Sequence, residues 1–204
     1  MPAPKDFLLG MKKPRLYVAL YALEGALREN TSSGAQDYYW AFIVAPKKGP
    51  KEQQCIRYRI KKSEAWEKLD PGKVEFERVE WDHDRCLVPL GRHDDIVARV
   101  LIAKIEEPER VEEHIQLAWP EQTMHVKNSG SARTSKDWVQ RVLEGLGSPS
   151  LGLGEERYLM LGKLADWGKI ESCCTSFAMK VVVERASLET VPTFDMLKNQ
   201  EVFQ

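Results

Sequence analysis

An apolar segment near the N-terminus limits the folds that this chain of 204 residues can adopt. Residues Leu16–Leu23 form a nearly unbroken apolar run made of leucine, tyrosine, valine and alanine. A strand covered on both faces buries such a run completely, because successive side chains of a strand point to opposite faces. The run is also far shorter than the roughly 18 apolar residues of a membrane-spanning helix. It therefore predicts a strand that is buried on both faces of a sheet.

Three further segments of the first half carry strand patterns. Tyr38–Val44 is apolar and aromatic, Cys55–Lys61 alternates apolar and basic residues, and Lys73–Trp81 alternates strictly. Short turns separate these segments, which favours an antiparallel meander. We interpret Asp82–Asp95 as a polar loop. The next segment, Ile96–Ile105, is apolar enough for either a strand or a buried helix segment, and periodicity alone cannot decide between the two.

Helical patterns dominate the second half of the chain. Pro108 and its acidic neighbours predict a helix start, and Thr134 or Ser135 is expected to cap a second helix that ends at Leu146. Trp138, Val142 and Leu146 of this second helix should pack against the sheet that carries Trp40 and Phe42. The predicted helices cover residues 107–118, 135–146 and 167–185. A polar loop is predicted over Glu121–Arg133 and a short helical piece over Tyr158–Leu164. The tail after Pro192 is expected to dock on the rest of the domain.

These elements predict an α/β fold of the α+β kind, in which about three helices pack against an antiparallel sheet of four to six strands. We interpret residues 1–14 as a loose N-terminal leader and residues 15–204 as a single domain. The N-terminal segment lacks the basic start, long apolar run and cleavage site of a signal peptide. The four cysteines have no metal-binding or redox spacing, so we expect a cytoplasmic protein with reduced thiols.

The charge composition bears on partners. Thirty Lys and Arg residues balance thirty-one Asp and Glu residues, for a net charge of −1. This balance argues against nucleic acid as the main ligand, because affinity for phosphates needs a concentrated positive field. We also expect no membrane span and no cofactor, and nothing in the sequence identifies a protein partner.

The densest cluster of titratable residues lies in the predicted loop between residues 82 and 95. Asp82–Asp84 and His93–Asp95 supply two imidazoles and four carboxylates, which could bind a divalent metal or perform acid–base chemistry. The spacing matches no HExxH-type motif, so we favour a solvated loop and predict no metal site. A basic patch with Tyr58 among it could bind an anion, but we interpret it as the solvated face of a strand and its turn; it consists of Lys47, Lys48, Lys51, Arg57, Arg59, Lys61 and Lys62.

Six blocks of the chain resemble, in the same order, an uncharacterised family of small proteins from filamentous fungi. The blocks are RLYVALYA (Arg15–Ala22), YYWAFIVAPK (Tyr38–Lys47), RYRIKK (Arg57–Lys62), RVLIAKIEEPERVEE (Arg99–Glu113), DWVQRVLEGL (Asp137–Leu146) and VPTFDML (Val191–Leu197). In that family the second block reads HWALIVGPK, and the helix after the long loop begins NCVxWV. These two blocks are similar to those of circularly permuted papain-like enzymes, the NlpC-like and lecithin:retinol acyltransferase-like groups.

The resemblance implies a permuted papain-like fold in which a strand histidine faces a cysteine at a helix N-terminus. In this chain both catalytic positions are replaced, because Tyr39 stands at the histidine position and Ser135, after Thr134, at the cysteine position. A tyrosine needs a pKa shift of about 3 units to act as a base at neutral pH, and an unassisted serine is a poor nucleophile. The resemblance therefore implies a degenerate active site that has lost Cys–His acyl chemistry. The Tyr39 phenol is still expected to reach the Ser135 hydroxyl, directly or through one water.

Three hypotheses about function follow. In the first, the chain is a non-catalytic module that binds a small molecule or a protein. In the second, it is an isomerase or cyclase of fungal secondary metabolism that uses Tyr39, Ser135 and a histidine. In the third, it is a serine hydrolase. In the hydrolase, Ser135 would be the nucleophile and His125 or His83 the base. A small apolar ligand of such a site would lie in a cleft lined by Tyr38, Trp40, Thr134 and Trp138. Aromatic residues like the three in this set more often build a core than a ligand site. An open apolar cleft would favour an enzyme, and a filled one a binding or structural role at the surface.

Overall fold

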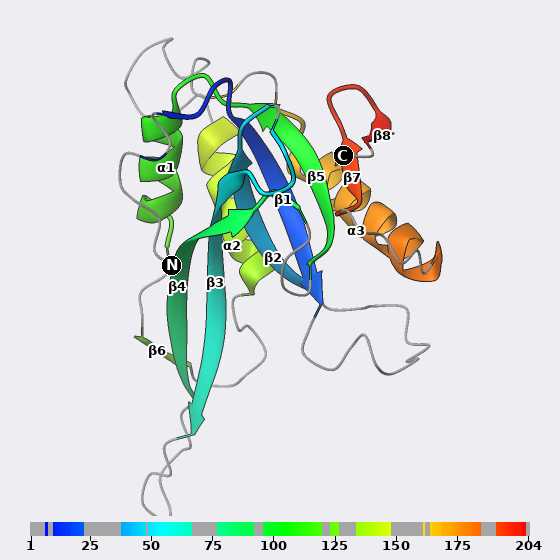
Figure 1. The fold of residues 1–204 in the computed structure, drawn as a ribbon. Coiled ribbons are helices and arrows are strands. Elements are labelled where there is room, and N and C mark those ends of the chain that lie inside the picture. The colour runs from blue at the N-terminus through cyan, green and yellow to red at the C-terminus, as the bar shows by residue number, and fades with distance from the viewer. Residues whose placement is uncertain are drawn as a thin grey trace, which may run out of the picture.

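A computed structural model describes residues 7, 10–22, 38–47, 49–66, 77–91, 96–119, 123–126, 134–147, 161, 164–184 and 191–202 of the chain. Eight strands and three helices lie within these residues (Figure 1). Their order is β1 (Arg15–Ala22), β2 (Tyr38–Ala45), β3 (Gln54–Trp66), β4 (Glu77–Pro89), β5 (Ile96–Lys104), α1 (Pro108–Leu117), β6 (Thr123–Val126), α2 (Ser135–Gly147), α3 (Trp167–Glu184), β7 (Thr193–Asp195) and β8 (Gln200–Val202).

The strands form one sheet in the order β6-β4-β3-β2-β1-β5-β7-β8. All neighbouring strands are antiparallel except β5 and β7, which run parallel. Strand β1 lies between β2 and β5, and all eight of its residues are buried, as its unbroken apolar run predicted. The α+β prediction is confirmed. The sheet has more strands than predicted because β6, β7 and β8 contain only three or four residues each, too few for a period to be recognised.

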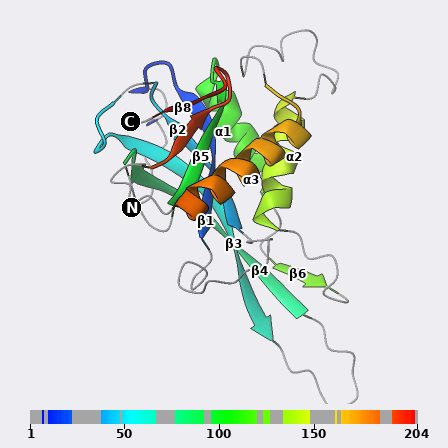
Figure 2. The same cartoon turned by 90° about the vertical axis from the view of Figure 1, so that its right-hand side faces the viewer.

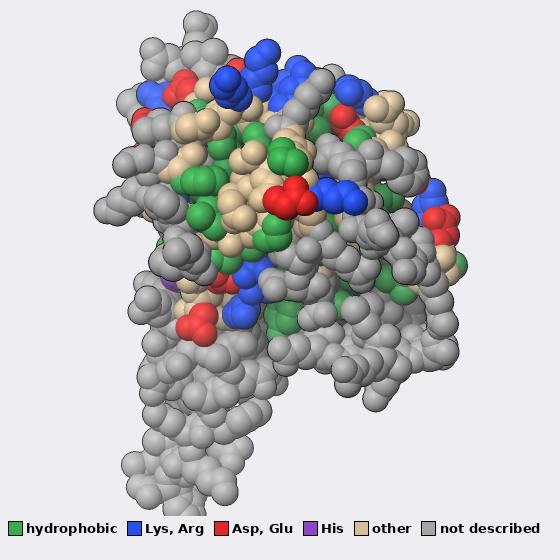
Figure 3. Space-filling view, in the orientation of Figure 1, with side chains coloured by type: hydrophobic (Ala, Val, Ile, Leu, Met, Phe, Trp, Pro, Cys, Tyr) green, Lys and Arg blue, Asp and Glu red, His purple; other side chains and the backbone are tan. Residues whose placement is uncertain are grey.

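The three helices cover one face of the sheet (Figures 1 and 2). On this face, alternate strand residues such as Val18 and Phe42 join side chains of all three helices in one cluster, which we call the helix-side core. The other face carries a second buried cluster, the opposite-face cluster. It contains Tyr17, Ala19, Tyr21, Ala41, Ile43, Ala45, Cys55, Val88, Leu90, Ile96, Leu101 and Val191. Figure 3 views the molecule from this second side and shows Lys and Arg side chains gathered along its upper edge.

Helix α2 takes the predicted position on the sheet. The ring of Trp138 packs edge-to-face against Phe42 of β2, with 5.4 Å between the ring centroids. The Asp137 N–H donates to Thr134 Oγ1 at 3.2 Å, and the Thr134 N–H donates in return to the Asp137 carboxylate at 2.7 Å. This reciprocal cap satisfies two backbone donors at the start of the helix. The predicted cap at Thr134 and the predicted packing of α2 are both confirmed.

Two segments predicted as loops contain strands. Residues 82–89 belong to β4, and Thr123–Val126 of the second loop forms β6. Strand β4 pairs with β3 from Glu77 to Pro89, and these backbone hydrogen bonds need no apolar side chains. The loop prediction at residues 82–89 was therefore wrong because the polar side chains concealed a paired backbone.

Other predicted elements agree with the structure where it describes them. The apolar segment after residue 95 is the strand β5, and Pro108 occupies the first turn of α1. Leu161 forms an isolated bridge with Ile105, so the predicted helical piece is extended at this residue; residues 158–160, 162 and 163 lie outside the described residues. In the segment interpreted as a leader, Met11 packs against the helix-side core. No helix in the described part of the chain is long and apolar enough to cross a membrane.

Candidate functional site

Ser135, at the predicted nucleophile position, begins α2 and is only 7% exposed. Its Oγ accepts a hydrogen bond from the backbone N–H of Trp40 at 3.0 Å. The pairing of β2 with β3 begins at Ala41, which faces Arg59. Trp40 is the residue just before Ala41, outside this pairing. The Ser135 hydroxyl therefore satisfies a buried backbone donor where the two strands cease to pair, and it ties α2 to β2.

Tyr39, at the predicted base position, faces away from α2. Its ring packs against the opposite-face cluster, whereas its neighbour Trp40 enters the helix-side core. The cross-strand partner of Tyr39 is Tyr21, which belongs to the same opposite-face cluster. Because the strand pleat sends adjacent side chains to opposite faces, the sheet lies between this phenol and Ser135. The predicted contact between the phenol and the serine hydroxyl is therefore not formed.

The four residues predicted to line a ligand cleft have structural contacts instead. Trp40 and Trp138 are 4% and 2% exposed, and the Trp40 ring lies 5.7 Å from the ring of Trp167. Thr134 is exposed and caps α2. Tyr38 is half-buried against the helix-side core, and burial raises the pKa of its phenol. Core side chains thus occupy the place between β2 and α2 where the cleft was expected.

The histidine candidates lie on the β4 side of the sheet. His125 is on β6, where its backbone pairs with Arg78 of β4; its side chain lies outside the described part of the structure. The ring of His83 stacks on Trp119, with 4.4 Å between centroids and an interplanar angle of 29°. His93, Asp94 and Asp95 also lie outside the described residues. Among the residues that are described, no three His, Cys, Asp or Glu side chains gather in a way that could hold a metal ion.

Arg57 and Arg59 of β3 belong to an ion network rather than to a solvated face, whereas Lys61 of the same strand is exposed, as predicted. The side chains of Arg57 and Arg59 are 7% and 11% exposed, and each donates to Asp84 Oδ2 at 2.8 Å. Both guanidinium groups also lie against the Tyr21 ring, at 5.6 and 5.4 Å from its centroid. Burial raises the pKa of Asp84, but its hydrogen bond to Arg59 and the two positive charges outweigh this effect, so the pKa is lowered. The network joins β1, β3 and β4 on the opposite face.

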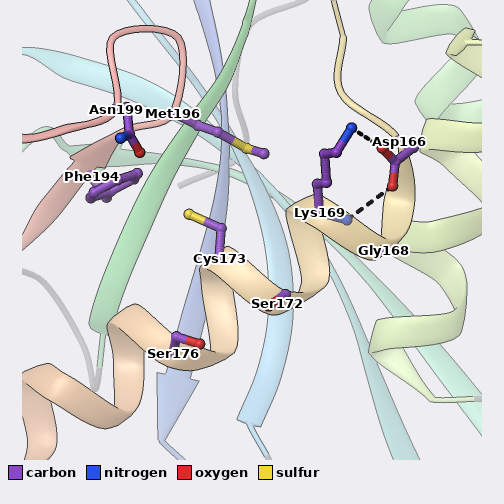
Figure 4. A pocket seen from close by; sticks show the side chains of 9 residues that line it. All are labelled: Asp166, Gly168, Lys169, Ser172, Cys173, Ser176, Phe194, Met196 and Asn199. Atoms are coloured by element: carbon purple, nitrogen blue, oxygen red, sulfur yellow. Dashed lines mark hydrogen bonds and ion pairs between the residues drawn. The ribbon is translucent and has the colours of Figure 1, made fainter.

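A surface groove of about 550 Å³ lies between α3 and the β7–β8 hairpin (Figure 4). Both of its walls are anchored. On its inner side α3 buries Cys174 in the helix-side core, and its Phe177 ring lies 5.6 Å from the Phe194 ring of β7. The hairpin is held to β5 by the Met196 N–H, which donates to the Leu101 carbonyl at 3.1 Å. The residues that line the groove are Asp166, Gly168, Lys169, Ser172, Cys173, Ser176, Phe194, Met196 and Asn199.

The groove combines apolar and polar groups. Cys173 and Met196 point into the space between helix and hairpin, while Asp166 and Lys169 lie at the N-terminal end of α3 (Figure 4). Asp166 Oδ2 forms an ion pair with Lys169 Nζ at 3.0 Å, and hydrogen bonding to Lys169 lowers the pKa of Asp166. Burial raises the pKa of the Cys173 thiol, which keeps it protonated and weakly nucleophilic near neutral pH. The Cys173 thiol is therefore not an activated nucleophile, and the groove offers groups for binding rather than for thiol catalysis.

The sequence contained the signals for both walls but not for the groove. Cys173 belonged to the apolar face of a predicted helix, and Phe194 and Met196 to a tail predicted to dock. Only the parallel pairing of β7 with β5 brings that tail beside α3.

Comparison with known proteins gives one match. The profile of a family of unknown function, DUF6914, matches residues 13–203. No curated protein and no solved structure gives a significant match. The match confirms that the resembling blocks belong to an uncharacterised family, whereas the papain-like similarity and the fungal setting stay predictions.

Proposed function

We propose that this chain, which belongs to the DUF6914 family of unknown function, is a small-molecule-binding protein that has no acyl-transfer activity. The observation that carries the proposal is the groove between α3 and the β7–β8 hairpin. Its volume of about 550 Å³ lies within the range of about 300–1,000 Å³ that is typical of small-ligand sites. Its lining combines the weakly polar or apolar side chains of Cys173, Phe194 and Met196 with charged and hydrogen-bonding groups that can orient a ligand.

The surroundings of Ser135 support the non-catalytic part of the proposal. A serine nucleophile needs a base within hydrogen-bond reach and a path to the substrate. Here the hydroxyl accepts a backbone hydrogen bond and lies among core side chains, and Tyr39 is on the other side of the sheet. The hydrolase and the isomerase hypotheses both place a base beside Ser135, and the geometry of β2 and α2 does not favour either.

The anchoring of the groove walls supports the binding part. Besides the Met196–Leu101 hydrogen bond, Arg99 Nε donates to the Thr193 hydroxyl at 2.7 Å, which fixes the start of β7 against β5. A site whose walls are already ordered loses less conformational entropy when a ligand binds. The fold thus presents the groove in a form that is ready to bind.

Covalent capture of fragments at Cys173 tests the proposal. A library of small disulfide fragments would be exchanged onto the protein under partly reducing conditions, and the labelled cysteine identified by peptide sequencing. We expect a structurally related subset of fragments to label Cys173 at concentrations at least tenfold lower than Cys86, which is also half-buried but lies outside the groove. Uniform labelling of both thiols by all fragments would contradict a binding groove.

Two tryptophan variants provide the control. Ser176→Trp places a large ring in the groove and should reduce fragment capture at Cys173 at least tenfold. Glu144→Trp adds the same ring to an exposed position of α2, away from the groove, and should leave capture unchanged. Equal effects of the two variants would show that capture does not depend on the groove.

A further inference from the structure

We infer that the groove between α3 and the β7–β8 hairpin selects an uncharged aromatic ligand that carries hydroxyl or carbonyl groups. This inference rests on the proposed binding function of the same groove. It follows from three properties of the lining residues: their cancelled charges, their soft apolar surface, and their hydrogen-bonding groups on both walls.

The first property is that the charges at the groove's end cancel. The N–H groups at the start of a helix ordinarily attract anions, but Asp166 already occupies this position in α3. Its Oδ1 accepts the Lys169 N–H at 3.1 Å, and its Oδ2 pairs with Lys169 Nζ at 3.0 Å. An anionic ligand would meet the Asp166 carboxylate, and a cationic ligand would have to compete with Lys169. A neutral ligand meets neither obstacle.

The second property is a soft, polarisable surface. The thiol of Cys173, the thioether of Met196 and the ring of Phe194 all line the groove (Figure 4). Sulfur atoms make favourable contacts with aromatic rings, and tilted ring pairs are favourable as well. Phe194 and Met196 are each half-buried, so part of their surface stays available to a ligand. An aromatic ring gains more from these three side chains than a saturated ring of the same size.

The third property is the presence of hydrogen-bonding side chains on both walls. Ser172 and Ser176 stand one turn apart on α3, and Asn199 lies at the turn of the hairpin. Asn199 has a positive φ of 55°, a conformation that asparagine tolerates better than most residues. Hydroxyl and amide groups both donate and accept hydrogen bonds, so they can pair with a ligand hydroxyl or carbonyl.

Three matched compounds test the inference: 2-naphthol, 2-naphthoate and 2-decalol, the saturated alcohol. Binding would be followed by NMR of methyl-labelled methionine, with the Met196 signal assigned through Met196→Leu. We expect 2-naphthol to shift this signal with a Kd at least threefold below that of 2-naphthoate and of 2-decalol. Tighter or equal binding of the anion, or equal binding of the saturated alcohol, would overturn the inference.

Variants of the ion pair test the charge argument separately. The preference is the ratio of the Kd of 2-naphthoate to the Kd of 2-naphthol. Asp166→Asn should lower this ratio at least twofold. Lys169→Gln should raise it, because this variant leaves the Asp166 carboxylate without its ion-pair partner. Asp137→Asn removes a carboxylate from the first turn of α2, outside the groove, and should leave the preference for naphthol over naphthoate unchanged. If Cys173 captures fragments but none of the three compounds shifts Met196, the inference fails while the binding function stands. If capture also fails, both are wrong.

Discussion

The contact between α1 and α2 leads to a prediction about a single methyl group. His114 of α1 lies against Gly145 of α2, and a Cβ added at position 145 would overlap His114 Nε2 and lie 2.6 Å from Cε1. Heavy atoms do not approach a Cβ this closely, so Gly145→Ala requires the half-buried His114 ring or the helix to move. The glycine therefore permits the close approach of the two helices.

The expected magnitude comes from two opposing effects. Alanine is favoured over glycine in a helix interior by about 1 kcal/mol. Overpacking of a well-packed contact costs about 1–3 kcal/mol. We therefore expect Gly145→Ala to lower the free energy of unfolding by about 1 kcal/mol, which corresponds to a fall in Tm of about 2–4 °C for a chain of this size.

A double-mutant cycle with His114→Ala measures the contact directly. Once the ring is absent, Gly145→Ala should raise the free energy of unfolding by about 0.5–1 kcal/mol through helix propensity alone. The coupling between the two sites should then be about 1–3 kcal/mol in urea denaturation. Gly147→Ala is the matched control, because its Cβ would meet only Leu164, at an ordinary 3.5 Å. A Gly145→Ala effect that is the same with and without His114 would refute the reasoning.

Three further predictions concern contacts that β2, β3 and β4 make with helices or with each other. Ser135→Ala leaves the buried Trp40 N–H without its acceptor and should lower the free energy of unfolding by about 1–3 kcal/mol in urea denaturation. In the wild-type protein, serine-directed fluorophosphonates should not label Ser135, and labelling seen by mass spectrometry would restore the hydrolase hypothesis. Glu112→Ala removes the partner of Arg85, whose side chain is 14% exposed, and should lower the free energy of unfolding by about 3 kcal/mol, whereas no change would mean that the pair between β4 and α1 contributes nothing. The lowered pKa of Asp84 means that its carboxylate stabilises the fold above the unfolded pKa of about 4, and that this stabilisation is lost as the pH falls through the folded pKa. Asp84→Asn should therefore lower stability at pH 7 and flatten the acid side of the stability profile measured between pH 2 and 7, and an unchanged acid slope would contradict the role of the ion network.

The start of α2 shows how far local patterns reach. Thr134 or Ser135 is predicted as a cap because a hydroxyl residue precedes the apolar spacing of the helix, and the structure assigns this role to Thr134, which exchanges hydrogen bonds with Asp137. The role of Ser135 could not be predicted in the same way. Its partner Trp40 is 95 residues away in sequence and needs an acceptor only because β3 ceases to pair with β2 at that point.

The side to which Tyr39 points was likewise beyond local reasoning. The motif order placed Tyr39 on a strand next to α2, and its backbone does lie there. The alternation of side chains along β2 then admits only one of Tyr39 and Trp40 on the helix side. Packing decided between them, because the Trp40 ring meets Trp167 in the helix-side core while Tyr39 pairs with Tyr21 on the other face.

The sequence by itself determined the elements whose stability depends on neighbours along the chain. The unbroken run of β1 needs cover on both faces, and the cap and apolar spacing of α2 specify a helix and its buried side. Only the tertiary structure decided the length of β4, the ion network of Arg57, Arg59 and Asp84, and the groove that Cys173 and Met196 line from opposite sides. Each of these depends on strand pairing and packing between segments that are far apart in sequence, and the pattern of one segment does not identify its partner.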